Sequence, residues 1–107
     1  MASSKRKPGR FQVSRYDVAE HLRDDEEMAL YLQAIVEEYA DDPQASTAIA
    51  RALGDIARAR GMAAIAREAG LSRESLYKAL SGERSPEMAT ILKVSRALGL
   101  KWSVQPA

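Results

Sequence analysis

Residues 64–80, AIAREAGLSRESLYKAL, decide the fold of this chain of 107 residues. Two apolar patterns with helical spacing stand on either side of Gly70, and Ser72 directly precedes the second pattern. Glycine adopts the positive φ angle that a tight turn requires, and serine is a favoured N-cap for a helix. The stretch therefore predicts a helix-turn-helix unit at 62–80, made of short helices at 62–69 and 73–80.

The second short helix is predicted to have an apolar face and a polar face. Leu76 and Leu80 share the inner face, which leaves the polar side chains on the surface, where they can reach a major groove. Glu74 has two interpretations, because it could accept a hydrogen bond from cytosine or pair with Lys78 one turn later. The candidate DNA-binding residues are Arg67 on the first helix and Ser72, Arg73, Glu74, Ser75, Tyr77 and Lys78 on the second.

Two longer helices are expected upstream. Asp24, followed by Glu27 three residues later, is a favourable N-cap for the first. Asp42 as a cap and Pro43 in the first turn begin the second, which Gly61 ends. The buried stripe of the first comprises Met28, Leu32, Ile35, Val36 and Tyr39. The inner face of the second comprises Ala45, Ala48, Ile49, Ala52, Leu53, Ile56 and Ala59.

One more helix follows the helix-turn-helix unit. Ser85 and Pro86 open it, and it runs to Leu98 and stops at Gly99. Residues 100–104 then alternate apolar and polar, which fits a short C-terminal strand or an extended arm. The sequence thus predicts an all-α domain of about five helices.

Charge is distributed unevenly along a chain whose net charge is +1. Residues 1–15 carry five bases and no acid, residues 16–42 ten acids and one base, and residues 43–107 ten bases and five acids. The first segment predicts a flexible basic N-terminal tail, and residues 16–107 a single helical domain, with 16–22 extended or in a turn. The tail could follow a phosphate backbone or merely aid solubility, and the acidic segment could attract a basic partner or form a solvated face.

Composition argues against several functional classes. The chain has no cysteine and one histidine, His21, so it has no thiol nucleophile, no nucleophile and base pair and no ligand set for a metal. The adjacent carboxylates at 24–27 are better explained by helix capping than by acid-base chemistry. We therefore expect no enzyme activity, metal or cofactor. No apolar run approaches the roughly 18 residues that span a bilayer, so we expect a cytoplasmic protein without a membrane partner.

The helix-turn-helix unit at 62–80 and the segments around it resemble the lambda-repressor-like helix-turn-helix of the probable addiction module antidote family. The members of this family are HigA-like antitoxins of type II toxin-antitoxin pairs. The likeness is carried by residues 60–62, 66–80, 92–94 and 97–100, and upstream by residues 16–17, 22, 31–32 and 52–59. Two features depart from the pattern. Residues 62–64 read Met-Ala-Ala where many such domains have a glutamine, and loop 81–86 differs from the Gly-Asn-Pro version common in the family.

The resemblance implies an antitoxin that binds operator DNA, neutralises a small basic toxin of the RelE/ParE type encoded nearby, and represses their shared operon. A homodimer is expected, because one reading helix makes few base contacts and two copies would read half-sites about 34 Å apart. Trp102 could anchor such a dimer or pack on its own core. The alternatives are a stand-alone transcriptional repressor without a toxin partner and a module whose two helices bind protein in place of DNA.

Overall fold

The structure is a computed structural model, and it describes residues 24–107. The predictions for the tail at 1–15, for residues 16–22 and for His21 lie outside the described residues. Within them the chain forms five helices and no strand, which confirms the predicted all-α fold. These helices are α2 (Asp25–Glu38), α3 (Ala45–Arg60), α4 (Met62–Ala69), α5 (Arg73–Ala79) and α6 (Met88–Ala97).

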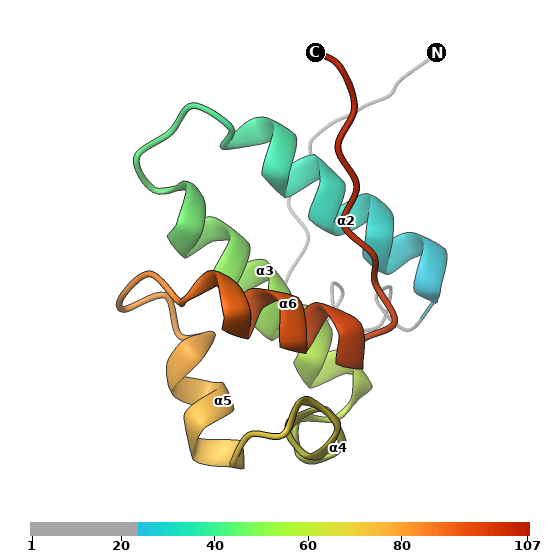
Figure 1. Cartoon of the computed structure of the whole chain (residues 1–107), viewed down its shortest axis with the longest axis vertical. Helices are drawn as coiled ribbons and strands as arrows, with labels where there is room; N and C mark the ends of the chain where they lie inside the picture. Colours follow the sequence, from blue (N-terminus) through green and yellow to red (C-terminus); the bar gives the residue numbers. More distant parts are fainter. Residues whose placement is uncertain (1–23) are drawn as a thin grey trace.

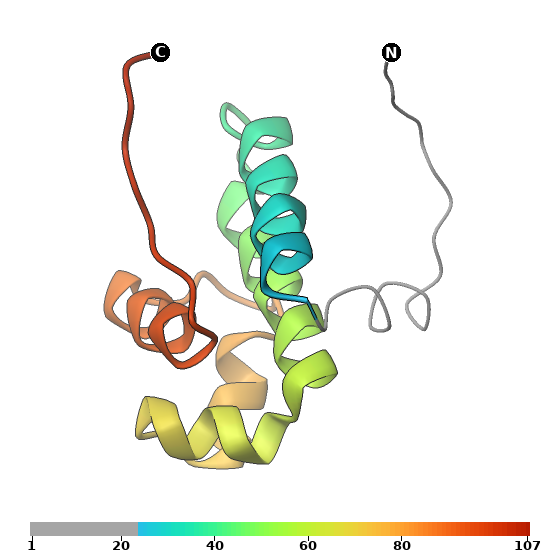
Figure 2. The ribbon, with the colours of Figure 1, turned by 90° about the vertical axis from the view of Figure 1, so that its right-hand side faces the viewer.

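The helices form two groups at opposite ends of the described part of the molecule. α2 packs along α3, whereas α4 contacts α3, α5 and α6. In both views, α2 lies at one end and the pair α4 and α5 at the other, with α6 between them (Figures 1 and 2). The helix that carries the predicted reading residues is therefore separated from the acidic helix by the thickness of the core.

The core fills the space between these helices with aliphatic side chains. The largest hydrophobic side chains that are almost completely buried are Met28, Leu53, Ile56, Leu76, Val94 and Leu98. They come from α2, α3, α5, α6 and the C-cap of α6, and Leu76 brings α5 into this core. α4 adds Met62, Ile65 and Ala66. Burial of a large aliphatic side chain contributes about 2 kcal/mol each, so this shared core is what fixes α5 relative to the longer helices.

The face predicted for α3 is only partly right. Ala52, Leu53 and Ile56 are buried as predicted. The other predicted positions are only half-buried: Ala45, Ala48, Ile49 and Ala59. Ala50, Gly54 and Ala57 are buried as well, because α3 is covered by α2 on one side and by α4 and α6 on another. A single amphipathic stripe cannot describe a helix with neighbours on two sides.

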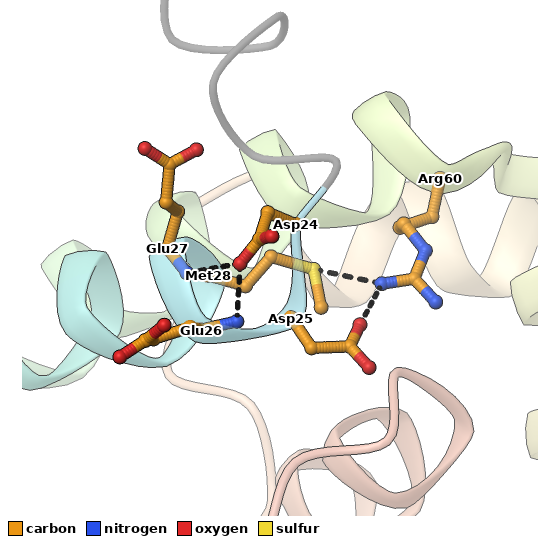
Figure 3. Close-up of polar contacts among 6 residues, drawn as sticks. All are labelled: Asp24, Asp25, Glu26, Glu27, Met28 and Arg60. Atoms are coloured by element: carbon orange, nitrogen blue, oxygen red, sulfur yellow. Dashed lines mark hydrogen bonds and ion pairs between the residues drawn. The ribbon is translucent and has the colours of Figure 1, made fainter.

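The predicted start of α2 is confirmed. Asp24 is its N-cap, and its Oδ1 accepts hydrogen bonds from the backbone N–H groups of Glu26 at 2.8 Å and Glu27 at 3.2 Å (Figure 3). These bonds satisfy two of the N–H groups that every helix start leaves without an intrahelical acceptor. The carboxylate of Asp24 therefore caps the N-terminus of α2, as the sequence predicts.

Arg60, the last residue of α3, connects that helix to the first turn of α2. Its Nη1 donates to Asp25 Oδ1 at 2.8 Å and lies 3.1 Å from Sδ of the fully buried Met28 (Figure 3). Because Asp25 is largely exposed, the ion pair is worth less than about 1 kcal/mol. The contact orients α2 more than it stabilises the fold.

The predicted start of α3 at Asp42 and Pro43 is wrong by two residues. Asp42 Oδ1 accepts from the N–H of Gln44 at 2.7 Å, and its carbonyl oxygen accepts from the N–H of Ala45 at 3.0 Å. Both bonds close a turn that precedes the helix. The helix itself begins at Ala45, with Gln44 as an N-cap that makes no side-chain capping bond.

The predicted start of α6 is also too early, because Ser85 is engaged elsewhere. Its hydroxyl forms a 2.6 Å hydrogen bond with the hydroxyl of Ser46 in the first turn of α3. Pro86 and Glu87 continue the loop, Glu87 is the N-cap, and α6 begins at Met88. A tertiary contact thus displaces the serine that a local pattern assigns to the helix start.

The C-terminal segment after α6 is an extended arm, so the alternative of a short strand is wrong for this chain. Trp102 is 38% exposed, and its Nε1 donates to Ser95 Oγ at 2.8 Å. Ser95 is 1% exposed, and a buried hydroxyl needs a hydrogen-bond partner, which the Trp102 N–H supplies. Of the two roles considered for Trp102, the structure shows packing on its own chain.

Candidate nucleic-acid interface

The two short helices are joined by the predicted three-residue turn. α4 ends at Ala69, and Gly70 follows in the left-handed region with φ 75° and ψ 28°. The N–H of Gly70 donates to the carbonyl of Arg67 at 3.2 Å, and the N–H of Leu71 donates to that of Ala66 at 2.9 Å. These bonds close the end of α4, and the positive φ explains why glycine occupies the turn. The chain then enters α5 at an angle to α4 (Figure 2).

Ser72 caps α5 as predicted. Its hydroxyl oxygen accepts from the backbone N–H of Ser75 at 2.9 Å and donates to the Ser75 hydroxyl at 2.8 Å. Both side chains are exposed. The two hydroxyls therefore hold each other in place at the solvent-facing start of the helix.

Replacing Ser72 by alanine is expected to lower the free energy of unfolding by about 1 kcal/mol, because the Ser75 N–H loses its acceptor. Urea denaturation followed by circular dichroism measures this change. Ser103→Ala is the matched control, since Ser103 is exposed and lies in the C-terminal arm, away from any helix start. An equal effect of the two substitutions would contradict a capping role for Ser72.

The candidate DNA-binding side chains lie on α4, at the N-cap of α5 and on α5 itself. All seven are exposed: Arg67, Ser72, Arg73, Glu74, Ser75, Tyr77 and Lys78. Leu76, among them in sequence, is fully buried and fixes the orientation of the helix. The structure therefore confirms that α5 has a buried apolar face and an exposed polar face, as predicted.

Arg73 and Tyr77 interact across one turn of α5. The guanidinium carbon of Arg73 lies 5.8 Å from the centroid of the Tyr77 ring, which is within the range of a cation–π contact. Glu74 and Lys78 are also one turn apart, yet no ion pair joins them in residues 24–107. The polar face of α5 thus presents an Arg-Tyr pair beside an acid and a base that are not bound to each other.

Arg51 of α3 is a basic residue near this surface that the sequence pattern does not reveal. A Cβ built on Gly82, just beyond α5, would lie 2.6 Å from Arg51 Nε, so the arginine side chain passes directly over the loop. Arg51 itself is exposed. Positions 51 and 82 come together only through tertiary packing, so no local sequence pattern predicts this contact.

Gly54 of α3 marks the closest approach between α3 and the end of α5. It is buried, and a Cβ at this position would lie 3.2 Å from the carbonyl oxygen and 3.4 Å from the Cβ of Leu80. An isolated glycine inside a helical pattern is a signal of such an approach. Its position shows that α3 packs directly against the backbone at the C-terminal end of α5.

Two surface grooves lie outside the α5 face. The first, of about 440 Å³, runs between α2 and residues 100–105. The second, of about 300 Å³, lies between the starts of α3 and α6 and includes Met88 and Leu92, which are 68% and 48% exposed. In residues 24–107, no three potential metal-ligating side chains gather, and no helix has the length and apolarity needed to cross a membrane.

The described residues form a small all-helical domain in which two short helices carry exposed polar side chains. Residues 12–106 match the model of the family described as "Probable addiction module antidote protein", and the chain belongs to this family. It is also 54% identical, over 94 residues, to an uncharacterized protein of Haemophilus influenzae, covering 88% of this chain and 92% of that protein. No solved structure matches the chain. Membership in an antidote family implies a toxin as partner.

Proposed function

We propose that this chain is the antitoxin of a type II toxin-antitoxin module, acting in the cytoplasm. It binds operator DNA through α5, represses its own operon, and neutralises a small basic toxin of the RelE/ParE type. The observation that carries the DNA-binding part is the common exposure of seven polar side chains on a capped, core-anchored helix pair. Family membership supports the antidote part over a stand-alone repressor. The activity is binding alone, with no catalytic step.

The chemistry of α5 suits a major groove. Arg73 presents a planar fork of donors that matches guanine O6 and N7, and Ser75, Tyr77 and Lys78 can contact phosphates or base edges. The contact with the Tyr77 ring restricts the Arg73 guanidinium before DNA is bound. Less side-chain freedom is then lost on binding, which favours affinity.

A homodimer completes the proposal. One helix of this length reaches only a few base pairs, whereas a two-fold pair reads two half-sites about 34 Å apart. Lambda-repressor-like docking of α5 is part of the same proposal. A palindromic operator with half-sites at this spacing follows from that symmetry.

The test is a gel-shift titration of the DNA upstream of the gene, at fixed salt, with Arg73→Ala and Tyr77→Ala. Removal of a base-reading or positioning side chain costs about 1–3 kcal/mol, so each variant is expected to bind at least about fivefold more weakly. Unrelated DNA of the same length shows whether the loss is specific.

Arg96→Ala is the matched control, because Arg96 is equally exposed but lies in the last turn of α6. It removes the same charge and is expected to change affinity less than about threefold. If Arg73→Ala and Tyr77→Ala bind the upstream DNA as the parent does, α5 is not the reading helix.

A further inference from the structure

The groove between α2 and residues 100–105, here called the α2 groove, has an apolar floor and an open top. Its α2 side runs from Ala29 to Glu37, with Leu32 at 6% exposure and Val36 half-buried. Its other side is the C-terminal arm, which runs past α2 (Figure 1). Val104 stands in this arm at 98% exposure. The groove thus offers apolar surface that residues 24–107 do not cover.

All the charged residues of α2 and of the turn after it are acids. Glu37 and Lys101 are the charged residues of the lining, and they balance each other. Outside the lining, residues 24–50 contain seven acids and no base. Of these, Asp25 is paired with Arg60, whereas Glu26, Glu38 and Asp41 are exposed on or just after α2. An apolar groove in an acidic surface selects a partner that is itself basic.

The position of the α2 groove separates it from the proposed DNA surface. α2 lies at the end of the described molecule opposite α4 and α5 in both views (Figures 1 and 2). A phosphate backbone at α5 would repel an acidic surface placed beside it, and this arrangement keeps the two apart. The α2 groove is therefore distinct from the proposed DNA surface.

We propose that the α2 groove is the docking site for a basic protein partner, which inserts an apolar side chain between α2 and the C-terminal arm and places Lys or Arg side chains against the surrounding carboxylates. The proposal rests on the proposed antidote function, in which that partner is the toxin. Apolar anchors that enter a groove carry most of the energy of such interfaces, and the charges set partner choice and association rate.

The test measures the affinity of the full chain for the purified protein encoded by the neighbouring gene, by isothermal titration calorimetry. The groove variant, Ala29→Arg with Glu37→Arg, places two large side chains in the groove and reverses the charge at position 37. The control, Ala63→Arg with Glu68→Arg, lies on α4 at the opposite end of the described molecule, is also exposed and is outside the groove lining. Both pairs change the net charge equally, because each replaces one alanine and one glutamate by arginine. Arginine suits helix interiors, so both should fold as the parent does.

The groove variant is expected to bind the partner at least about tenfold more weakly, and the control less than about threefold. Equal weakening by both pairs would show attraction by net charge alone and overturn the groove. Unchanged affinity in both would overturn it as well, while the antidote function would stand. If the parent itself does not bind the neighbour's product, the antidote function fails, and the groove proposal with it.

Two other occupants would give different results. The chain's own residues 1–15 are basic, so Lys5, Arg6 and Lys7 changed together to glutamine would raise partner affinity if that segment filled the groove. A second copy would be indicated if the parent sediments as a dimer and the groove variant as a monomer. Either result would overturn the proposal, whereas unchanged behaviour in both measurements supports it.

Discussion

Replacing Gly54 by valine is expected to lower the free energy of unfolding by about 3 kcal/mol. The reason is the close approach of α3 to the end of α5, where even a single Cβ would lie 3.2 Å from the carbonyl oxygen of Leu80. Valine adds two methyl groups at a branch that cannot rotate away within a helix. The neighbour is backbone, so relief requires α5 to move. Urea denaturation followed by circular dichroism measures the loss.

Gly54→Ala and Ala34→Val are the controls. Alanine adds only the Cβ, and its better helix propensity offsets the tight contact, so this variant stays within about 1 kcal/mol of the parent. Ala34 is exposed on α2, where valine costs about 0.5 kcal/mol in propensity alone. If Gly54→Val unfolds at the same urea concentration as Ala34→Val, the close seating of α5 on α3 is wrong.

Leu76→Ala is expected to cost about 3 kcal/mol, within the range for deleting a buried leucine from a core. Leu76 is fully buried and holds α5 against the other helices. The adjacent Tyr77 is 43% exposed, and Tyr77→Ala is expected to change stability by less than about 0.5 kcal/mol. Thermal denaturation of the two variants separates these effects on neighbouring positions.

The same two variants distinguish loss of fold from loss of recognition. Tyr77→Ala should weaken DNA binding while remaining folded, whereas Leu76→Ala should weaken DNA binding only to the extent that it unfolds. A stable, fully folded Leu76→Ala protein would contradict the core position of this side chain. It would also remove the argument that the core fixes the direction of α5.

Local signals in the sequence predicted much of the fold. Asp24 and Ser72 make the capping bonds that their positions indicate, and Gly70 has the positive φ that the turn needs. The two helix starts that were predicted wrongly have different causes. Ser85 bonds to Ser46, which is distant in sequence, in place of capping α6. Asp42 closes a local turn with Gln44 before α3, so two local structures compete for the same carboxylate.

The candidate interface was predictable to the extent that it depends on one helix. The alternation of buried Leu76 with exposed neighbours follows from helical periodicity, and the exposure of all seven candidates agrees with it. Two features were not predictable, because each joins elements distant in sequence. One is the α2 groove, and the other is the contact of the Arg51 side chain with the loop at Gly82. Only the folded chain brings them together.

The indole of Trp102 gives this molecule an intrinsic optical reporter. It is the sole tryptophan in the chain, lines both the α2 groove and the groove beside α6, and is hydrogen-bonded to Ser95. Indole emission shifts to shorter wavelength when water around the ring is replaced by apolar groups. Occupation of either groove is therefore visible without a label, while α5, which has no tryptophan, leaves that emission unaltered when it meets DNA.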